Sequence, residues 1–289
     1  MRYLVIVNPA AGNGRKHKIE SAVQVFRSAG HPVEIFWTGS RGDATAKARA
    51  AALSGEADAV IAAGGDGTVN EVARGLEGSK ISLGVLPLGT ANCLAREIGI
   101  PLRPVAAAKA LLKCKPRRIH VGRTEDTLFL LWTGVGIDGQ VVQQINVEAK
   151  KVLHHLEYVR QGFHTLLHYK PSPLRVTLDG KESTEACHVI IGNIRCYGGW
   201  FSVTPGAGLM NDELEVCLFR GNRSRDILRY SWGILWRKHM QYKDVTLCKA
   251  REIRIESDQP VPIQLDGDYL GTTPITVRRV PDAISLLMP

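Results

Sequence analysis

The feature that most constrains the fold is a glycine-rich run, GGDGT at residues 64–68, between an apolar stretch and a helical pattern. The apolar residues 59–63 are typical of a buried parallel strand, and residues 69–73 are typical of a helix. A strand that passes through a glycine turn into a helix predicts a parallel α/β unit. Because glycine has no Cβ and a helix N-terminus carries partial positive charge, the turn also predicts a phosphate site, and a nucleotide is the favoured ligand.

The first 120 residues alternate between strand and helix patterns. Strands are expected at residues 3–7, 33–37, 59–63 and 81–86, and helices at 16–28, 43–53, 69–73, 91–98 and 105–112. This alternation predicts a parallel sheet with helices on both faces.

After about residue 117, short strand patterns dominate. They are expected at residues 118–121, 128–133, 174–178, 188–192, 214–219, 245–247, 253–257, 262–265 and 275–278, with helices near 147–168 and 225–239. This pattern predicts an antiparallel β-sandwich. We therefore divide the chain into domains 1–122 and 123–289, with residues 283–288 as a segment that could return to the first domain.

The formal net charge of +9 lies almost entirely in the first domain, where 17 Lys and Arg stand against 9 Asp and Glu. This excess fits an anionic nucleotide or an anionic surface, and solubility explains it equally well. The basic residues are not interleaved with aromatic ones, so nucleic acid is not expected as a partner.

No apolar run reaches membrane-spanning length, and the first strand pattern begins near Met1. We therefore expect neither a transmembrane helix nor a signal peptide. The six cysteines lack metal-ligand spacing and are expected to be reduced thiols of a cytoplasmic protein.

Two further turns follow predicted strands of the first domain. NPAAGNG at residues 8–14 follows the first strand, and PLGTAN at residues 87–92 follows the strand at 81–86. Since ligands bind at the carboxyl ends of parallel strands, the three turns are expected to meet on one rim. None of them has the GK[ST] of a Walker loop or a GxGxxG with an acidic partner, so a dinucleotide oxidoreductase is not favoured.

Two threonines in these turns are candidate helix caps. Thr68 precedes Glu71 by three residues, which is the spacing of a capping box, and the pair is expected to fix the start of the helix. Thr90 can cap the next helix or donate its hydroxyl to a phosphate, and propensity favours the cap.

The three runs together resemble the nucleotide motifs of the diacylglycerol kinase catalytic family, which includes bacterial soluble lipid kinases and sphingosine kinases. The resemblance is strong over residues 1–100 and thinner afterwards. It implies an α/β N-terminal nucleotide-binding domain plus a C-terminal β-sandwich domain, with the active site in the interdomain cleft. ATP is then expected at Asn8, Pro9, Ala10, Ala11, Gly12, Thr38, Gly64, Gly65, Asp66, Gly67, Thr68, Val69, Asn70 and Thr90.

Later runs extend the likeness. GVGID at residues 134–138 resembles a family turn near the domain junction, and LMNDEL at 209–214 resembles the family's magnesium-binding segment. On that likeness Asp212 supplies a carboxylate, and Leu209 and Leu214 supply backbone carbonyls, the oxygen ligands that Mg²⁺ prefers. Without the likeness, Asp212 is an ordinary turn residue.

The run QLDGD at residues 264–268 resembles a family Asp-Gly-Glu motif, whose last carboxylate is proposed to take the proton from the lipid hydroxyl. Here that residue is Asp268, and Asp66 is expected to act with it as a direct or water-mediated metal partner. A tight hairpin turn explains Asp266 and Gly267 equally well, although it does not require an acid at 268.

The resulting hypothesis is an ATP- and Mg²⁺-dependent lipid kinase of phospholipid biosynthesis. It would phosphorylate a hydroxyl of a diacylglycerol-like or sphingoid membrane lipid from the cytoplasm. Contact with the inner membrane face would be transient and peripheral, and a homodimer is left open.

Two alternatives remain. An NAD kinase shares the GGDG loop, although the second domain lacks an Asn-Thr-Asp-like segment. A nucleotide- or lipid-binding regulator without catalysis is the other, because Cys93 stands where the family usually has Asp and Asp268 where it has Glu.

A basic stretch at residues 220–238 contains six Lys and Arg, one acid and several large apolar residues. Such a helix could rest on an anionic bilayer. Its apolar positions wrap most of the helix, which favours packing against the sandwich instead.

Overall fold

The computed structural model describes residues 1–11, 16–125, 127–148 and 171–289. The chain forms two compact units, each described here by itself. Unit 1 comprises Met1–Val121, Gly198–Trp200 and Val280–Pro289, and unit 2 comprises Gly122–Tyr197 and Phe201–Arg279.

Unit 1 is built on parallel strands. They are β1 (Tyr3–Val7), β2 (Val33–Trp37), β3 (Ala59–Gly64) and β4 (Ser82–Pro87), in the order β2-β1-β3-β4. Every residue of β1, β3 and β4 is buried, as expected for parallel strands covered on both faces. The end of β16 (Ile275–Met288) adds a further parallel strand, with Ser285 opposite Ser82.

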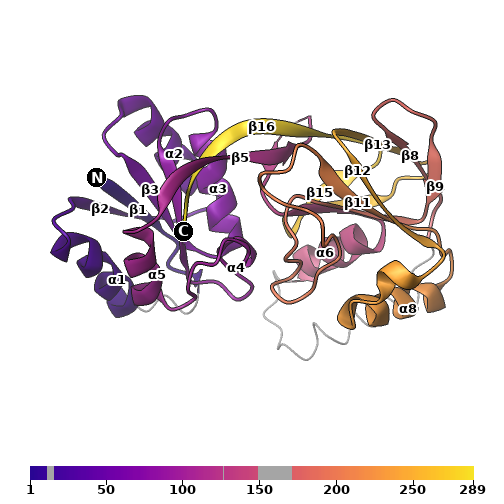
Figure 1. Cartoon of the computed structure of the whole chain (residues 1–289), viewed down its shortest axis with the longest axis horizontal. Helices are drawn as coiled ribbons and strands as arrows, with labels where there is room; N and C mark the ends of the chain where they lie inside the picture. Colours follow the sequence, from indigo (N-terminus) through magenta and orange to yellow (C-terminus); the bar gives the residue numbers. More distant parts are fainter. Residues whose placement is uncertain (12–15, 126, 149–170) are drawn as a thin grey trace. The chain divides into compact units, whose positions relative to one another are not determined.

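Helices cover both faces of this sheet (Figure 1). They are α1 (Lys16–Ser28), α2 (Asp43–Ser54), α3 (Asp66–Leu76), α4 (Cys93–Glu97) and α5 (Pro104–Leu111). α1 packs with α5, and α2 packs with α3. In the strand order, the chain passes from β1 to β2 in one direction and from β3 to β4 in the opposite direction. The gap between the carboxyl ends of β1 and β3 is therefore a topological switch point.

Unit 2 is a sandwich of two layers. One layer is antiparallel, in the order β12-β11-β10-β7-β14-β15, and the other contains β16, β13, β8 and β9. The first layer's bounds are β7 (Trp132–Val135), β10 (His188–Gly192), β11 (Leu214–Phe219), β12 (Val245–Ala250), β14 (Pro262–Leu265) and β15 (Asp268–Thr272). The second adds β8 (Leu174–Leu178), β9 (Thr184–Ala186) and β13 (Glu252–Glu256), while β5 (Lys115–Arg123) pairs with β16 and with β6 (Leu128–Phe129).

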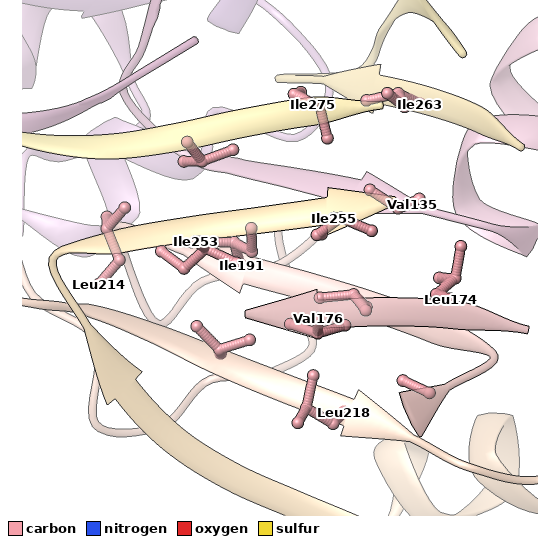
Figure 2. Close-up of a cluster of buried hydrophobic side chains, with 14 of the residues drawn as sticks. Val135, Leu174, Val176, Ile191, Leu214, Leu218, Ile253, Ile255, Ile263 and Ile275 are labelled. Atoms are coloured by element: carbon pink, nitrogen blue, oxygen red, sulfur yellow. The ribbon is translucent and has the colours of Figure 1, made fainter. Parts of the chain in front are cut away.

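The core of unit 2 lies between these layers (Figure 2). Val135, Ile191 and Leu214 from one layer meet Val176 and Ile253 from the other, and all five are buried. The predicted antiparallel sandwich is therefore confirmed.

Two helices decorate the sandwich. α6 (Ile137–Glu148) follows β7, and α8 (Ser224–Leu235) precedes a short 3₁₀ helix, η2 (His239–Gln241). Tyr230 of α8 packs in a second buried cluster with Ile190 and Cys217, which face the side of their strands opposite to the main core. The helix expected at 147–168 lies almost entirely outside the described residues.

The strand expected at 128–133 is interrupted, which corrects the sequence interpretation. The backbone amides of Leu130, Leu131 and Trp132 donate to the Asp266 carboxylate at 2.8, 2.9 and 2.9 Å. A carboxylate from a distant turn thus takes the donors of these residues, and the apolar run divides into β6 and β7. The short strands β9 and β15 were not predicted, and residues 275–278 and 283–288 belong to one continuous strand, β16.

No helix in the described part of the chain is long and apolar enough to cross a bilayer.

Candidate active site

The ends of β1 and β3 meet at the switch point of unit 1. The Asn8 backbone N–H donates to the Ala63 carbonyl at 3.0 Å, and the Asn8 side-chain amide lies 3.2 Å from the Thr68 hydroxyl. The Asn8 side chain also accepts from the Ala10 N–H at 2.9 Å. One asparagine therefore shapes its own loop and ties that loop to the start of α3.

The second and third loops touch backbone to backbone. Leu88 N–H donates to the Gly64 carbonyl at 2.9 Å. A Cβ on Gly89 would lie 2.6 Å from the Gly65 Cα, so only glycine permits this approach. The loops after β1, β3 and β4 thus converge on one rim, as the sequence predicts. Thr38 joins them, because its N–H donates to the Val7 carbonyl at 2.9 Å.

The start of α3 differs from the capping-box prediction, which is wrong. The helix begins at Asp66 with Gly65 as its N-cap and no side-chain cap, and Thr68 lies buried inside the first turn. Glu71 instead accepts a hydrogen bond from the Gly42 N–H at 3.1 Å. Since no side chain caps the first amides of α3, their N–H groups and the helix dipole suit an anion.

Thr90 does not cap α4, which corrects the preferred interpretation of this residue. Asn92 is the N-cap residue, and its side chain exchanges two hydrogen bonds with the Gly89 backbone, at 2.9 and 2.7 Å. Asn92 thereby closes the loop on itself. Thr90 is exposed at the loop surface.

Asp66 is fastened to α4. The Leu94 N–H donates to its carboxylate at 3.3 Å, and the Cys93 thiol and backbone also bond to it. Burial raises the pKa of Asp66, and these hydrogen bonds oppose the increase. Position 93 is the one at which the family usually has Asp, which would bring a second negative charge beside Asp66. The buried Cys93 gives Asp66 an S–H donor instead.

The other residues expected to bind ATP lie around the same loops. Pro9 and Ala10 are exposed, Ala11 is half-buried, Gly67 is exposed with open space at its Cα, and Val69 and Asn70 are buried in α3. Gly12 lies outside the described residues.

In unit 2, the proposed base stands beside a tight turn. Asp266 and Gly267 have φ of 49° and 88°, which a two-residue type I′ hairpin requires, and they join β14 to β15. Asp266 is occupied by the amides of residues 130–132. Asp268 is the half-buried first residue of β15.

A buried hydrogen-bond chain holds this turn. Gln264 accepts from the Gly267 N–H at 2.8 Å and donates to Asp138 at 2.7 Å. The Tyr197 hydroxyl donates to the other Asp138 oxygen at 2.5 Å. Desolvation raises the pKa of Asp138, opposed by these two donors. The GVGID and QLDGD runs are therefore parts of one network.

The expected metal segment is anchored by a residue that sequence reasoning missed. The Arg279 guanidinium donates to the Gly208 carbonyl at 2.9 Å and also to the Asn211 carbonyl and the Asn193 side chain. Burial lowers the pKa of Arg279 to about 10, and the Asp212 charge opposes this shift. Strand alternation was the available signal, since Ile275, Val277 and Arg279 share the buried face of β16.

Arg279 does not bind the expected metal ligands. It binds the carbonyls of Gly208 and Asn211, not those of Leu209 or Leu214, while the Asp212 side chain is exposed. One carboxylate and backbone carbonyls form an oxygen donor set that fits a hard divalent cation. Within the described residues, no group of three or more His, Cys, Asp or Glu side chains could hold a metal.

Comparisons with known proteins find two family matches in this chain. The diacylglycerol kinase catalytic domain family matches residues 2–124, and the YegS C-terminal NAD kinase beta sandwich-like domain matches residues 132–288. A diacylglycerol kinase of Bacillus subtilis is 29% identical over 294 residues, covering 100% of this chain and 96% of the relative. A probable lipid kinase YegS-like of Chromohalobacter salexigens is 29% identical, covering 94% and 89%.

Solved structures show the same likeness. The crystal structure of a diacylglycerol kinase from Bacillus anthracis superposes with a TM-score of 0.78 at 25% identity, covering 100% of this chain and 97% of that one. The α/β domain followed by a β-sandwich domain is thereby confirmed as the fold.

Proposed function

This chain belongs to the family that joins a diacylglycerol kinase catalytic domain to a YegS-type sandwich domain, and from that premise we propose that it is an ATP-dependent lipid kinase. It transfers the γ-phosphate to a hydroxyl of a membrane lipid, either diacylglycerol-like or sphingoid. The curated relatives are named diacylglycerol kinase or probable lipid kinase, which supports this class of reaction.

The observation that carries the proposal is the rim of three loops at the switch point of unit 1. Its glycines admit close backbone approach, and the first amides of α3 have no side-chain cap. Backbone N–H groups and a helix dipole stabilise phosphate without needing a Walker lysine. The rim is accordingly assigned to the phosphates of ATP.

Phosphoryl transfer depends on positioning and on neutralising the charge of the γ-phosphate. The family implies a divalent metal for that neutralisation, and Mg²⁺ is the proposed ion. Asp212 and the carbonyls of Leu209 and Leu214 would hold it. When bound, the ion would neutralise phosphate oxygens.

Asp268 is the proposed general base that accepts the proton of the lipid hydroxyl. Its neighbour Asp266 is committed to three backbone amides, so it is not free for this role. Gln264 fixes the turn that carries Asp268 through the Gly267 amide. The proposed base thus stands on a turn fixed from both sides.

The proposal is tested by supplying radiolabelled ATP, Mg²⁺ and a panel of lipid alcohols in mixed micelles. We expect label in a lipid product, and Asp268→Ala should lower kcat by about 10²–10⁴-fold while ATP still binds. Asp258→Ala removes an exposed acid elsewhere in unit 2 and serves as the matched control. Wild-type turnover in Asp268→Ala would remove Asp268 as the base.

The same assay separates the alternatives. The sandwich domain carries NAD kinase in its family name, so NAD is included among the acceptors. NADP formation would identify an NAD kinase, and ATP binding without transfer to any acceptor would identify a regulator.

The lipid substrate implies a place of action. We propose that the protein works in the cytoplasm and touches the inner membrane face transiently. It would act in phospholipid biosynthesis without binding nucleic acid. A homodimer is a separate proposal, which a measurement of the molar mass in solution would test.

A further inference from the structure

The α8 helix of unit 2 has two apolar faces. Ile227 and Tyr230 face the sandwich and are buried, and the Tyr230 ring lies 4.8 Å from that of Phe219. Leu228, Trp232, Leu235 and Trp236 follow the spacing i, i+4, i+7 and i+8, which forms a second stripe on the opposite side of the helix. Packing therefore explains only one of the two faces.

The second stripe is exposed. Trp232 and Trp236 are 62% and 59% exposed, and their rings lie 5.8 Å apart. In the described part of the chain, 13 large hydrophobic side chains are exposed. Four of them form this stripe, and a fifth, Met240, lies in the turn after the helix. Such clustering is the mark of an interaction surface, whereas scattered exposed residues are not. We name Leu228, Trp232, Leu235, Trp236 and Met240 the α8 stripe, and Figure 1 shows α8 at the periphery of unit 2.

Cations surround the stripe. Arg223, Arg225, Arg237 and Lys238 are exposed around it. The nearby acids Asp226 and Asp244 share one ion-pair partner, Arg229, so these three groups together leave one negative charge against the four exposed cations. The surface therefore combines exposed indole rings with an excess of positive charge.

We propose that the α8 stripe is a membrane-docking surface that inserts into the interface of an anionic lipid bilayer. Tryptophan favours the headgroup region, and flanking Arg and Lys attract anionic headgroups. A two-fold interface with a second copy of the chain would place these cations against the identical cations of that copy, and like charges repel one another. The inference rests on the proposed function, since a kinase of a membrane lipid must meet its substrate at the bilayer.

An open pocket supports the choice of lipid. It measures about 280 Å³ and is lined by Trp232, Gly233, Trp236, Lys238 and Tyr242. Two indole rings beside an ammonium group match the interface between acyl chains and headgroups.

The test is co-sedimentation of the full chain with phosphatidylcholine vesicles, with and without about one third phosphatidylglycerol. Wild type should bind the anionic vesicles, and the double variant Trp232→Ser with Trp236→Ser should bind at least about tenfold more weakly. Arg225→Gln with Lys238→Gln should weaken binding by about fivefold for each cation. Leu53→Ser with Leu102→Ser removes exposed apolar residues of unit 1 and should bind like wild type.

Several outcomes would overturn the proposal: no binding by wild type, equal binding to neutral vesicles, or wild-type binding by a Trp double variant that melts normally. The measurement needs neither ATP nor an acceptor. A chain that docks through the tryptophans but phosphorylates no lipid would disprove the proposed function and leave the docking surface standing.

Discussion

Two glycines make room for buried polar side chains in unit 2. A Cβ on Gly134 would lie 1.9 Å from an Asp138 carboxylate oxygen, and a Cβ on Gly136 would lie 2.7 Å from the His188 ring. Gly136 also has a φ of 106°, which favours glycine. The GxGxD spacing therefore has a steric cause: it leaves space for the carboxylate that holds Gln264.

His188 gives a pH dependence at the same place. Burial lowers the pKa of His188 to about 4, and its Nδ1 accepts the Ile137 N–H at 3.3 Å. Below the unfolded pKa of about 6.5 the unfolded chain binds a proton that the folded chain does not, so stability falls as the pH falls toward 4. From about pH 7.5 to about pH 5, we expect His188 to account for a loss of about 2 kcal/mol.

Urea unfolding at the two pH values measures this loss. His188→Gln should remove most of the difference, whereas His17→Gln, at an exposed position on α1, should leave it unchanged. An undiminished pH dependence in His188→Gln would show that another group is responsible.

At the scale of elements, the β3–α3 junction depends on one position without a side chain. A Cβ on Gly64 would lie 2.3 Å from the Thr68 hydroxyl oxygen, which Asn8 also contacts. Gly67, three residues later, has nothing within 4 Å of such a Cβ. The same substitution should therefore destabilise the protein at Gly64, the last residue of β3, and not at Gly67, in the first turn of α3.

Gly64→Ala should displace the start of α3 and destabilise the protein by about 1–3 kcal/mol, and ATP affinity should fall with it. Gly67→Ala should not lower the melting temperature, because its methyl group meets open space and alanine favours a helix more than glycine does. Thermal melts of both variants, with ATP titration of the first, check the expectation. A Gly64→Ala protein that melts like wild type would contradict the close packing of Gly64 against Thr68.

At the scale of the whole molecule, unit 1 is completed by the end of the chain. Ile284, Leu286 and Leu287 are buried, and the strand that carries them pairs with β4. The Ser82 and Ser285 hydroxyls lie 2.9 Å apart in this pairing, and Gly78 N–H donates to the Ala283 carbonyl at 3.0 Å. A fragment ending at Val121 would expose the apolar edge of β4.

Residues 1–121 joined by a Gly/Ser linker to residues 280–289 should therefore fold cooperatively, and residues 1–121 alone should not. Burial of three large side chains contributes roughly 5 kcal/mol, comparable with the whole stability of a small domain. Circular dichroism melts of the two fragments, with a scrambled ten-residue tail as control, measure the difference. Equal cooperative melts would show that the last strand is dispensable.

The elements whose signals are local could be predicted from the sequence alone. β1, β2 and α1 have the predicted bounds, because apolar period and turn residues lie within the segments themselves. The three glycine loops were found for the same reason. Because parallel strands bring their carboxyl ends to one edge, the convergence of these loops followed from the strand order.

The side chains that hold these loops in place could not be predicted from the sequence and are known from the folded structure. Asn92 rather than Thr90 is the N-cap residue of α4 and closes its loop onto Gly89. Asp66 bonds to the start of that helix, and Asp266 interrupts a strand more than 130 residues earlier in the chain. Arg279 braces a loop 68 residues away. A local sequence pattern indicates which faces of a helix or strand are apolar. The partner of a buried polar group, in contrast, comes from a distant segment that the fold brings within hydrogen-bond distance.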